Sequence, residues 1–557
     1  MPNVHPVFDL SDRFVDAFAR SQPLWATFLG ISGHDHEWGD LGPEGIDALE
    51  ELLRDTAREL DALPAATTDD DELAIRVLGD IIASELEPVE HDDHLRDISH
   101  LTSTVLATRD VLDIQDDTTP EGREALLARL ASLPDALASW QRRIELALDR
   151  GIVVAQRQVH SVIEQLRSAA SDDGAFARRV ASLAELDPAL ADPAGATLPA
   201  IRERVRELTS FLEHRYLPQA STVDAVGPER YAREAERHVG EPVDLDEAVA
   251  WAWQELVHLR TRAEQVATRI DPAATLPEVL ERLHDDPAFG APDPETFRQL
   301  MQRRQTTALE QLADTRFDVP DSIRHVEVAL APPGSPIGAQ YVGPSEDLSR
   351  PGRIWWSLAD HPHVPLFEEV STAYHEGFPG HHLQLGFQTM HTGRLSRAHR
   401  LLSGTTGYIE GWALYAETLM DEFGALEEPQ YELGYITGQL LRVVRVLVDI
   451  GLHLEQRIPD DAPFHPGEAW TVPLAVEALT DLAALAPAYA RSEITRYLGW
   501  PGQAISYSLG QRTFLELRDA RRARDGAAFD EVGFHADVLG AGAIRLDHLR
   551  ELVLRER

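Results

Sequence analysis

The chain has 557 residues, contains no cysteine, and all of its 51 basic residues are arginines. These absences exclude disulfides, cysteine-ligated metals, thiolate nucleophiles, Schiff-base lysines and the lysine of a phosphate-binding P-loop. The 94 acidic residues bring the formal net charge to -43, which repels nucleic-acid phosphates and anionic membranes, so we expect neither as a partner.

The N-terminal segment, residues 1–29, interrupts its apolar positions with charges at Asp9, Asp12 and Arg13. A secretory signal needs an uncharged apolar stretch, and a membrane-spanning helix needs about 20 such residues. The segment has neither pattern. We therefore expect a cytoplasmic protein that does not enter the membrane.

Helical periodicity dominates the chain. Apolar residues recur at spacings of three and four with Arg and Glu between them, which is typical of amphipathic helices. Turn-like clusters such as 116–120 and 285–294 separate these stretches. Amphipathic helices are predicted over residues 123–150, 154–166, 201–217, 245–270 and 294–312.

Strand-like sequence is confined to residues 324–331 and 353–358, on either side of a loop rich in Pro and Gly. We therefore predict one large, mainly α-helical domain over residues 1–557, with a small sheet near its middle. Residues 1–325 are expected to form a helical cover, and residues 326–557 a catalytic helical region.

One segment, residues 367–388, differs from the rest and reads FEEVSTAYHEGFPGHHLQLGFQ. Four residues suited to metal chemistry lie within eight positions: His375, Glu376, His381 and His382. In the zinc-hydrolase pattern H-E-x-x-H, two histidines one helical turn apart bind the metal, and the glutamate activates water. Here a proline, Pro379, stands where the second histidine of that pattern would be.

An unbroken helix brings neither later histidine to His375. At about 100° per residue His381 would lie on another face, and His382, on the same face, would stand roughly 10 Å away. Pro379 breaks a helix because its ring clashes with the carbonyl four residues earlier, and the flanking glycines permit unusual dihedral angles. We therefore predict a break that folds one histidine back beside His375. His381 requires the smaller insertion, and His382 is the alternative.

A catalytic zinc site takes three protein ligands and leaves the fourth position to water. Residues 408–421 read YIEGWALYAETLMD, and we select Glu410, at the start of this helical pattern, as the third ligand. Glu417, on the same helical face, is a candidate to orient a ligand histidine. A His/His/Glu set indicates zinc, although these ligand types also accommodate Mn, Co or Fe.

The motifs HEGFPGHHLQ at 375–384 and EGWALYAE at 410–417 resemble the bacterial domain-of-unknown-function family 885, and further similar pieces extend over most of the chain. Members of that family look like zinc metallopeptidases of the gluzincin kind. The resemblance implies a mostly helical metallopeptidase-like fold with a deep channel. It also implies zinc bound by His375, Glu410 and His381 or His382, with Glu376 as the general base.

A further piece, EITRYLGWPGQAISYSLGQ at 493–511, carries donors for the negative charge that develops during hydrolysis. These donors are Arg496, Tyr497, Gln503 and Tyr507. Arg496 is alternatively the ligand of a substrate carboxylate or the partner of Glu493, and the tyrosines are alternatively core residues. Asp449 and His453, at i and i+4, are either a relay behind the site or an ordinary helix pair.

These residues predict a metallohydrolase that cuts amide bonds of small peptides or peptide-like metabolites. Glu376 would move the proton, and Tyr497 or Tyr507 would stabilise the oxyanion. One alternative is a metal-dependent enzyme that acts on a specialised non-peptide metabolite, and another is a non-catalytic binding protein that keeps the fold. The intact Glu376 argues against the latter, because metal binding alone requires no base.

Overall fold

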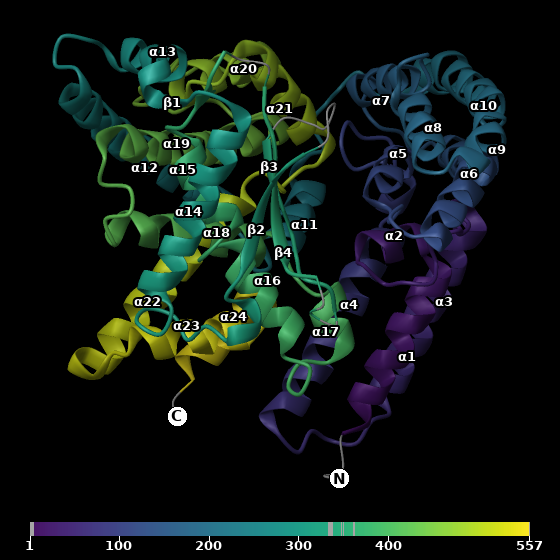
Figure 1. Ribbon diagram of the computed structural model, residues 1–557, viewed down its shortest axis with the longest axis horizontal. Helices are drawn as coiled ribbons and strands as arrows, with labels where there is room; N and C mark the ends of the chain where they lie inside the picture. Colours follow the sequence, from purple (N-terminus) through teal and green to yellow (C-terminus); the bar gives the residue numbers. More distant parts are fainter. Residues whose placement is uncertain (1–4, 332–337, 347, 349, 360–361, 556–557) are drawn as a thin grey trace. The chain divides into compact units, whose positions relative to one another are not determined.

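The computed structural model of the protein describes residues 5–331, 338–346, 348, 350–359 and 362–555 (Figure 1). The chain divides into two compact units, each described by itself below. Unit 1 comprises the chain up to Asp224 with Ser396–Leu402 and Leu498–Trp500, and unit 2 comprises Ala225–Leu395, Ser403–Tyr497 and the chain from Pro501. The predicted cover region (residues 1–325) and catalytic region (residues 326–557) are defined by their functions, so the division into units does not test them. They stay a prediction.

Unit 1 is built from amphipathic helices around a core that includes Leu133, Leu137 and Trp140. Its longest helix begins where Thr119 accepts a hydrogen bond from the Gly122 amide, with a proline at the first helical position. The helices are α1 (Pro6–Ser21), α2 (Pro23–Phe28), α3 (Pro43–Asp61), α4 (Asp69–Glu90), α5 (Thr104–Ile114), α6 (Pro120–Asp149), α7 (Gln156–Ala169), α8 (Ala175–Leu186), α9 (Ala191–Gly195), α10 (Leu198–Phe211) and α17 (Arg397–Leu402). Short 3₁₀ or π turns lie at Asp93–Leu95, Pro188–Leu190, Leu212–Tyr216 and Leu217–Gln219.

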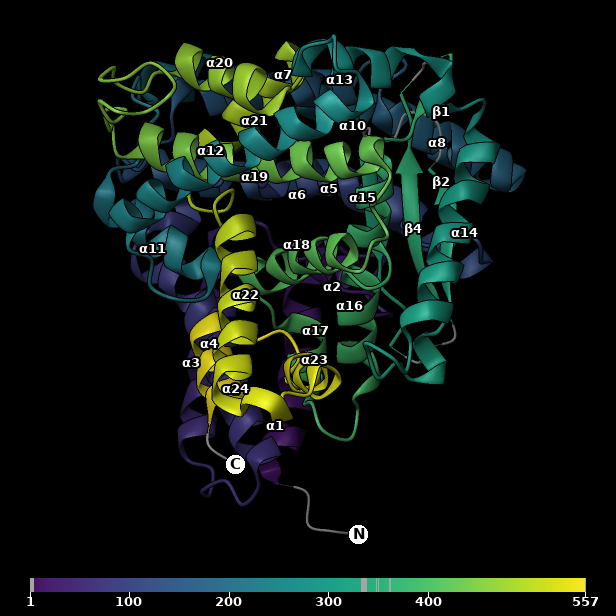
Figure 2. The ribbon, with the colours of Figure 1, turned by 90° about the vertical axis from the view of Figure 1, so that its left-hand side faces the viewer.

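Unit 2 combines helices with the strands of the protein. Its helices are α11 (Pro228–Val239), α12 (Leu245–Ile270), α13 (Leu276–Asp285), α14 (Pro294–Leu312), α15 (Glu369–Glu376), α16 (His381–Met390), α18 (Thr406–Glu422), α19 (Pro429–His453), α20 (Val472–Ala483), most of α21 (Pro487–Gly499), α22 (Ser506–Asp525), α23 (Glu531–Gly540) and α24 (Leu546–Leu554). Short 3₁₀ turns lie at Pro287–Phe289, Asp321–Ile323 and Gly526–Ala528. The long helices α12 and α19 pack along each other (Figure 2).

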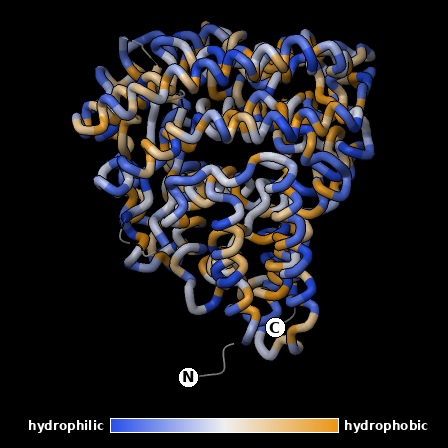
Figure 3. The backbone as a smooth tube through the Cα atoms, turned by 90° about the vertical axis from the view of Figure 1, so that its right-hand side faces the viewer, coloured by the Kyte–Doolittle hydropathy of each residue, from blue (hydrophilic) through white to orange (hydrophobic). Residues whose placement is uncertain are grey.

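The mainly helical fold is confirmed, and α12 and α14 have the predicted bounds. Hydrophobic and hydrophilic residues alternate along the helices, as the periodicity indicated (Figure 3). Within the described part of the chain, no helix combines the length and apolar character needed to cross a membrane. The deep channel implied by the resemblance stays a prediction.

A three-stranded sheet lies beside the helices that carry the metal motif. Its order is β2 (Val326–Leu330), β4 (Gly352–Ser357) and β3 (Gly338–Val342), with β2 parallel and β3 antiparallel to the central β4 (Figure 1). Both predicted strands are therefore confirmed. The edge strand β3 falls inside the loop predicted between them, and a second, two-stranded sheet joins β1 (Gly290–Ala291) to β5 (Val364–Pro365).

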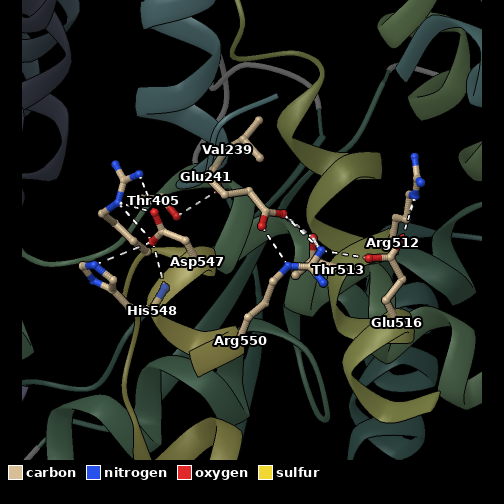
Figure 4. A network of polar contacts seen from close by, with 10 residues as sticks. Val239, Glu241, Thr405, Arg512, Thr513, Glu516, Asp547, His548 and Arg550 are labelled. Carbon is tan, nitrogen blue, oxygen red and sulfur yellow. Dashed lines mark hydrogen bonds and ion pairs between the residues drawn. The ribbon is translucent and has the colours of Figure 1, made fainter. Parts of the chain in front are cut away.

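Helices α18 and α22 cross at very short range. A Cβ atom added to Gly411 would lie 2.5 Å from the backbone carbonyl carbon of Gly510, so only glycine fits there. This close approach places the first turn of α22 against the first half of α18, where Glu410 lies. The end of the chain is held by a polar network in which Arg550 on α24 bonds to Glu241 and to Glu516 on α22 (Figure 4).

Candidate metal centre

The predicted break at Pro379 is confirmed, because α15 ends at Glu376 and α16 begins at His381. The backbone between the two helices folds tightly, and the Gly380 amide donates to the Tyr374 carbonyl at 3.0 Å. A Cβ atom at Gly380 would stand 2.0 Å from the carbonyl oxygen of His375, which only glycine avoids. The chain thereby returns His381 to His375, with their ring centroids 4.8 Å apart.

A buried glutamine from a distant helix satisfies the backbone groups at the break. Gln305 on α14 is fully buried; its amide donates to the Ala373 carbonyl at 2.6 Å and accepts from the Phe378 amide at 2.7 Å. Unpaired, these buried backbone groups would each cost about 1–3 kcal/mol. Gln305 therefore stabilises the conformation that positions His381.

Two imidazole and two carboxylate groups meet at this break. Nε2 of His375 and Nε2 of His381 lie 3.3 and 3.6 Å from the same Glu410 oxygen, Oε2. Glu376 is the adjacent carboxylate: its ligand atom and those of His375 and His381 all lie within 4.8 Å of one another. The structure thus brings His375, Glu376, His381 and Glu410 together.

The spacing of these atoms fits a metal ion. Ligands about 2.1 Å from a tetrahedral zinc ion stand about 3.4 Å from one another, close to the two distances that join the histidine nitrogens to Glu410. Two imidazoles and a carboxylate are also a donor set that zinc accepts. The buried group at His375 and His381 can therefore hold a metal ion.

Glu417 orients His375 from behind. Nδ1 of His375 donates to Glu417 Oε1 at 2.8 Å, and Ser371 donates to the other oxygen of that carboxylate. This bond leaves Nε2 facing Glu410, as in sites where a carboxylate holds a metal-binding histidine. For His381, by contrast, no described residue bonds to Nδ1.

The charges of the cluster are coupled. Burial lowers the pKa of His375, but hydrogen bonds to Glu410 and Glu417 outweigh it and raise the pKa to about 10. Burial alone would raise the pKa of Glu410, yet its bonds to His375 and His381 hold it well below the usual range. Without a metal, a proton on His375 thus supplies the positive charge that the carboxylates require.

Glu376 is held by the edge strand of the sheet. The Tyr341 backbone amide on β3 donates to Glu376 Oε2 at 2.9 Å, and this is the hydrogen bond that the described residues give to the carboxylate. Burial raises the pKa of Glu376 and the Glu410 charge adds to this, against the lowering effect of the two histidines. One oxygen of the carboxylate is thus anchored while the other remains open.

The structure does not bring His382 to this cluster. Its Nε2 bonds to the Ile323 carbonyl at 2.8 Å, and its Nδ1 bonds to the Tyr341 hydroxyl at 2.9 Å. Both ring nitrogens are therefore engaged elsewhere, and burial lowers its pKa to about 4. The neutral ring positions Tyr341, whose backbone amide in turn holds Glu376.

A second polar cluster contains Arg496, Tyr497 and Gln503. It also contains Arg445, which the sequence motifs did not predict as a site residue. Arg445 on α19 donates from Nη2 to Glu493 at 2.8 Å and from Nε to the Tyr497 hydroxyl at 3.0 Å. The Tyr497 hydroxyl itself donates to Glu493 at 2.7 Å. Tyr497 is thus buried and fully engaged.

Tyr507 lies beside Arg445 of this second cluster, on a helix that packs against the helix of Glu410. The Arg445 guanidinium carbon lies 4.9 Å from the centre of the Tyr507 ring. Burial raises the pKa of Tyr507, and the nearby charge of Glu410 raises it further. The tyrosine is half-buried in the first turn of α22, which packs on α18.

Asp449 and His453 lie behind these groups. Asp449 accepts hydrogen bonds from the Tyr231 hydroxyl at 2.8 Å and from the Gly502 amide at 3.0 Å. His453 bonds through Nε2 to the Tyr497 carbonyl. Both side chains are fully buried, and burial raises the pKa of Asp449 to about 7. These bonds hold α11, the end of α21 and the segment that follows it, and their partners among the described residues are not metal ligands.

Comparison with known proteins decides the family. The family described as bacterial protein of unknown function, DUF885, matches residues 23–553. The chain belongs to this family. No protein of the curated set matches it.

Two solved structures share the fold. A "putative lipoprotein" from Colwellia psychrerythraea is 21% identical, with a TM-score of 0.84 over 98% of both chains. A "putative lipoprotein of unknown function" from Shewanella oneidensis is 16% identical, with a TM-score of 0.74 over 98% of this chain and 99% of the other. At these identities the likeness shows the fold alone.

Three residues in or near the candidate metal centre were not predicted from the sequence. Gln305 lies in an ordinary polar helix with no local signal, and Tyr341 acts on Glu376 through its backbone. Arg445 had a detectable signal, because it interrupts the apolar run VVRVLVDIGL on a helix that is otherwise buried. A charged residue in such a position is rarely buried without a partner or a function.

Proposed function

We propose that the protein is a metal-dependent hydrolase that cuts amide bonds of small peptides or peptide-like metabolites. The observation that carries this proposal is the convergence of His375 and His381 on Glu410, with Glu376 beside them. A site that only stored metal would need no free carboxylate oxygen next to the ligands. The geometry favours His381 over His382 as the second ligand.

Zinc is the metal that this donor set favours, held by His375, His381 and Glu410. When bound, it would polarise the scissile carbonyl and make water more acidic. Manganese, cobalt and iron fit the same ligand types. Glu417 would keep His375 in the tautomer whose Nε2 faces the metal.

Glu376 has the position of a general base. Its open oxygen would accept a proton from the attacking water and pass it to the leaving amine, so that one C–N bond is replaced by a carboxylate and a free amine. The Tyr341 amide would hold the carboxylate during both transfers. Tyr507, which is half-buried and whose pKa is raised by the charge of Glu410, is a better oxyanion donor than the engaged Tyr497.

The proposal is tested by exchanging Glu376 for glutamine in the zinc-loaded protein. We expect kcat on a dipeptide and tripeptide library to fall about 10²- to 10⁴-fold, because the amide cannot accept the proton. Metal content, measured by elemental analysis, should remain near one ion per chain. Unchanged turnover in the variant would remove Glu376 as the base.

A matched control is Glu369→Gln on the same helix. Glu369 accepts a hydrogen bond from the Trp356 indole, and glutamine retains that acceptor. Burial raises the pKa of Glu369 to about 7, so this variant makes the same exchange of a buried carboxyl group for an amide, and we expect no loss of turnover. Absence of metal from the purified protein, and of any activity when zinc is added, would contradict the proposed function as a whole.

The cellular location remains a proposal as well. The sequence favours the cytoplasm, whereas the two structural relatives are named as putative lipoproteins, which favours the cell envelope. Fractionation of cells that express the full chain distinguishes the two. A protein found with the envelope would direct the substrate search towards extracytoplasmic peptides.

A further inference from the structure

The buried arginine of α19 has hydrogen-bonding capacity that the protein does not use. Arg445 engages Tyr497 with Nε and Glu493 with Nη2, and among the described residues these are the acceptors of its hydrogen bonds, which leaves Nη1 available to a further acceptor. Its side chain is only 7% exposed. A guanidinium buried with a free N–H group is unfavourable unless another acceptor completes its bonding.

A second arginine beside it is also incompletely bonded. Arg496 donates from Nη2 to Gln503 at 3.2 Å, and its Nη1 stands 3.6 Å from Glu493. Among the described residues, none accepts a hydrogen bond from its buried Nε. Two neighbouring arginines of unit 2 thus have unused donors.

The charges of this cluster do not cancel. Among the described residues, Glu493 is the carboxylate that both arginines contact. Burial raises the pKa of Glu493, but the charges of Arg445 and Arg496 outweigh this effect and hold the pKa below its usual value. Glu493 is therefore ionised. Asp449, the next acidic group, keeps its proton until about pH 7 because burial raises its pKa. The cluster therefore has a positive excess, although the whole chain has a net charge of -43.

The cluster adjoins the proposed reaction site. The Arg445 guanidinium carbon lies 4.9 Å from the centre of the Tyr507 ring, and Tyr507 is in the first turn of α22. Helix α22 packs against α18, the helix that carries Glu410, so the arginines and the metal ligands lie on neighbouring helices.

We infer that Arg445 and Arg496 form a subsite for a carboxylate of the substrate, next to the metal centre. Guanidinium groups match carboxylates in charge and in the geometry of their paired donors. The inference rests on the proposed function and narrows its substrate class. The substrates are short peptides or peptide-like amides with a free carboxylate close to the bond that is cut.

The first test compares acids with amides. Zinc-loaded protein is given a set of N-acetylated dipeptides, each with a free C-terminal carboxylate and as the C-terminal amide. We expect kcat/KM to be about tenfold to a hundredfold higher for the acids, as charged hydrogen bonds allow. In Arg496→Gln and Arg445→Met this preference should disappear through loss of activity on the acids alone.

Arg518→Gln is the matched control. Arg518 lies on α22, is as buried as Arg445, and pairs with both oxygens of Glu422. This variant loses the same charge and should keep the preference for acids. Arg445→Met removes the closer of the two charged partners of the buried Glu493, so Arg496→Gln alone decides the question where the former does not fold.

A second measurement separates this inference from the proposed function. Calorimetric titration of the zinc-free protein with acetyl-Gly-Leu and its C-terminal amide reports binding without turnover. Tighter binding of the acid, lost in Arg496→Gln, supports the subsite even where no peptide is hydrolysed. Equal hydrolysis of acids and amides, or the absence of any preference in binding, overturns the subsite, and in the former case the hydrolase proposal stands.

Discussion

Two buried arginines, one in each unit, show opposite ways of placing a guanidinium inside a protein. In unit 1, Arg129 is fully buried and donates to the carbonyls of Glu37, Pro23 and His34 and to the Gln115 side chain. It also lies 5.2 Å from the Trp38 ring. Burial lowers its pKa to about 10, so it stays charged, with each nitrogen bonded.

In unit 2, Arg445 has a carboxylate partner, which Arg129 lacks, and yet its bonds to described residues engage only Nε and Nη2. Desolvation is unfavourable for both groups, so each should be bonded as completely as the structure allows. Arg129 reaches that state within the protein and links distant loops to α6. Arg445 does not, and we therefore assign its remaining donor to a ligand.

The largest effect on stability is expected from Arg129→Met. Methionine leaves three backbone carbonyls and one amide oxygen without their donor, which should cost unit 1 about 3–6 kcal/mol. The loss is measured as faster hydrogen exchange in α2 and α6 and as a lower melting temperature. The protein that remains folded should keep its metal and its preference for acids.

Arg445→Met provides the comparison, since it also removes a charged donor from a buried acceptor, Glu493, which keeps the hydrogen bond from the Tyr497 hydroxyl. Both variants should lose stability, but only Arg445→Met should change which substrates are cut. A change of substrate preference in Arg129→Met, at full metal content, would break the distinction between a bonded structural arginine and an incompletely bonded functional one.

A smaller effect is expected from Gln305→Leu. The Gln305 amide is bonded within the protein, as Arg129 is, and yet it supports the metal centre. The leucine would leave the Phe378 amide unpaired and remove one of the two donors of the Ala373 carbonyl, the other being the Gly377 amide, at a cost of about 1–3 kcal/mol. Because these groups shape the break before His381, zinc affinity should fall about tenfold or more. Competition with a chromophoric chelator measures this affinity.

Gln302→Leu is the matched control on the same helix. Gln302 bridges two backbone groups of β2: it donates to the Val326 carbonyl at 3.0 Å and accepts from the Val328 amide at 2.9 Å. Its loss should weaken the sheet and leave zinc affinity unchanged. Equal losses of affinity in both variants would show that Gln305 acts through general stability alone.

The difference between features set by neighbours in the chain and features set by distant partners explains what could be predicted from the sequence. Helices such as α12 and α14 follow from local periodicity, and His375, Glu376 and Glu410 follow from motifs whose residues are close in the chain. The choice between His381 and His382 depends on the path of residues 377–380, which Gln305 supports from far away in the sequence. Local patterns contain no information on such a partner.

The strand β3 escaped prediction for a related reason. Its sequence GAQYV is short, starts with glycine and lacks the alternation seen in β4, where Ile354 and Trp356 face the core. Pairing with β4, rather than its own propensity, makes it a strand. Its contribution to the site, the Tyr341 amide, is a backbone group that any residue except proline could supply.

The smallest effect is expected from Tyr341→Phe, which tests the contact between β3 and the site. The change removes the hydroxyl that bonds to His382 and keeps the backbone amide that bonds to Glu376. We expect a loss of about 1 kcal/mol in stability. With Glu376 less firmly held, kcat should fall several-fold to about tenfold while KM and zinc content change little.

Tyr408→Phe separates positioning from stability. The Tyr408 hydroxyl is buried in unit 2 and donates to the Val538 carbonyl at 2.9 Å, on the side of α18 that packs against α22 and α23. Its removal should lower the melting temperature as much as Tyr341→Phe and leave kcat unchanged. If kcat falls equally in both, the bond between His382 and Tyr341 only stabilises the sheet. A fall of kcat in Tyr341→Phe alone would support a positioning role. A second check is His382→Gln, whose side chain can still accept a hydrogen bond from Tyr341 and should therefore retain most of the activity. Both results together would show that His382, although it binds no metal, acts on Glu376 through β3.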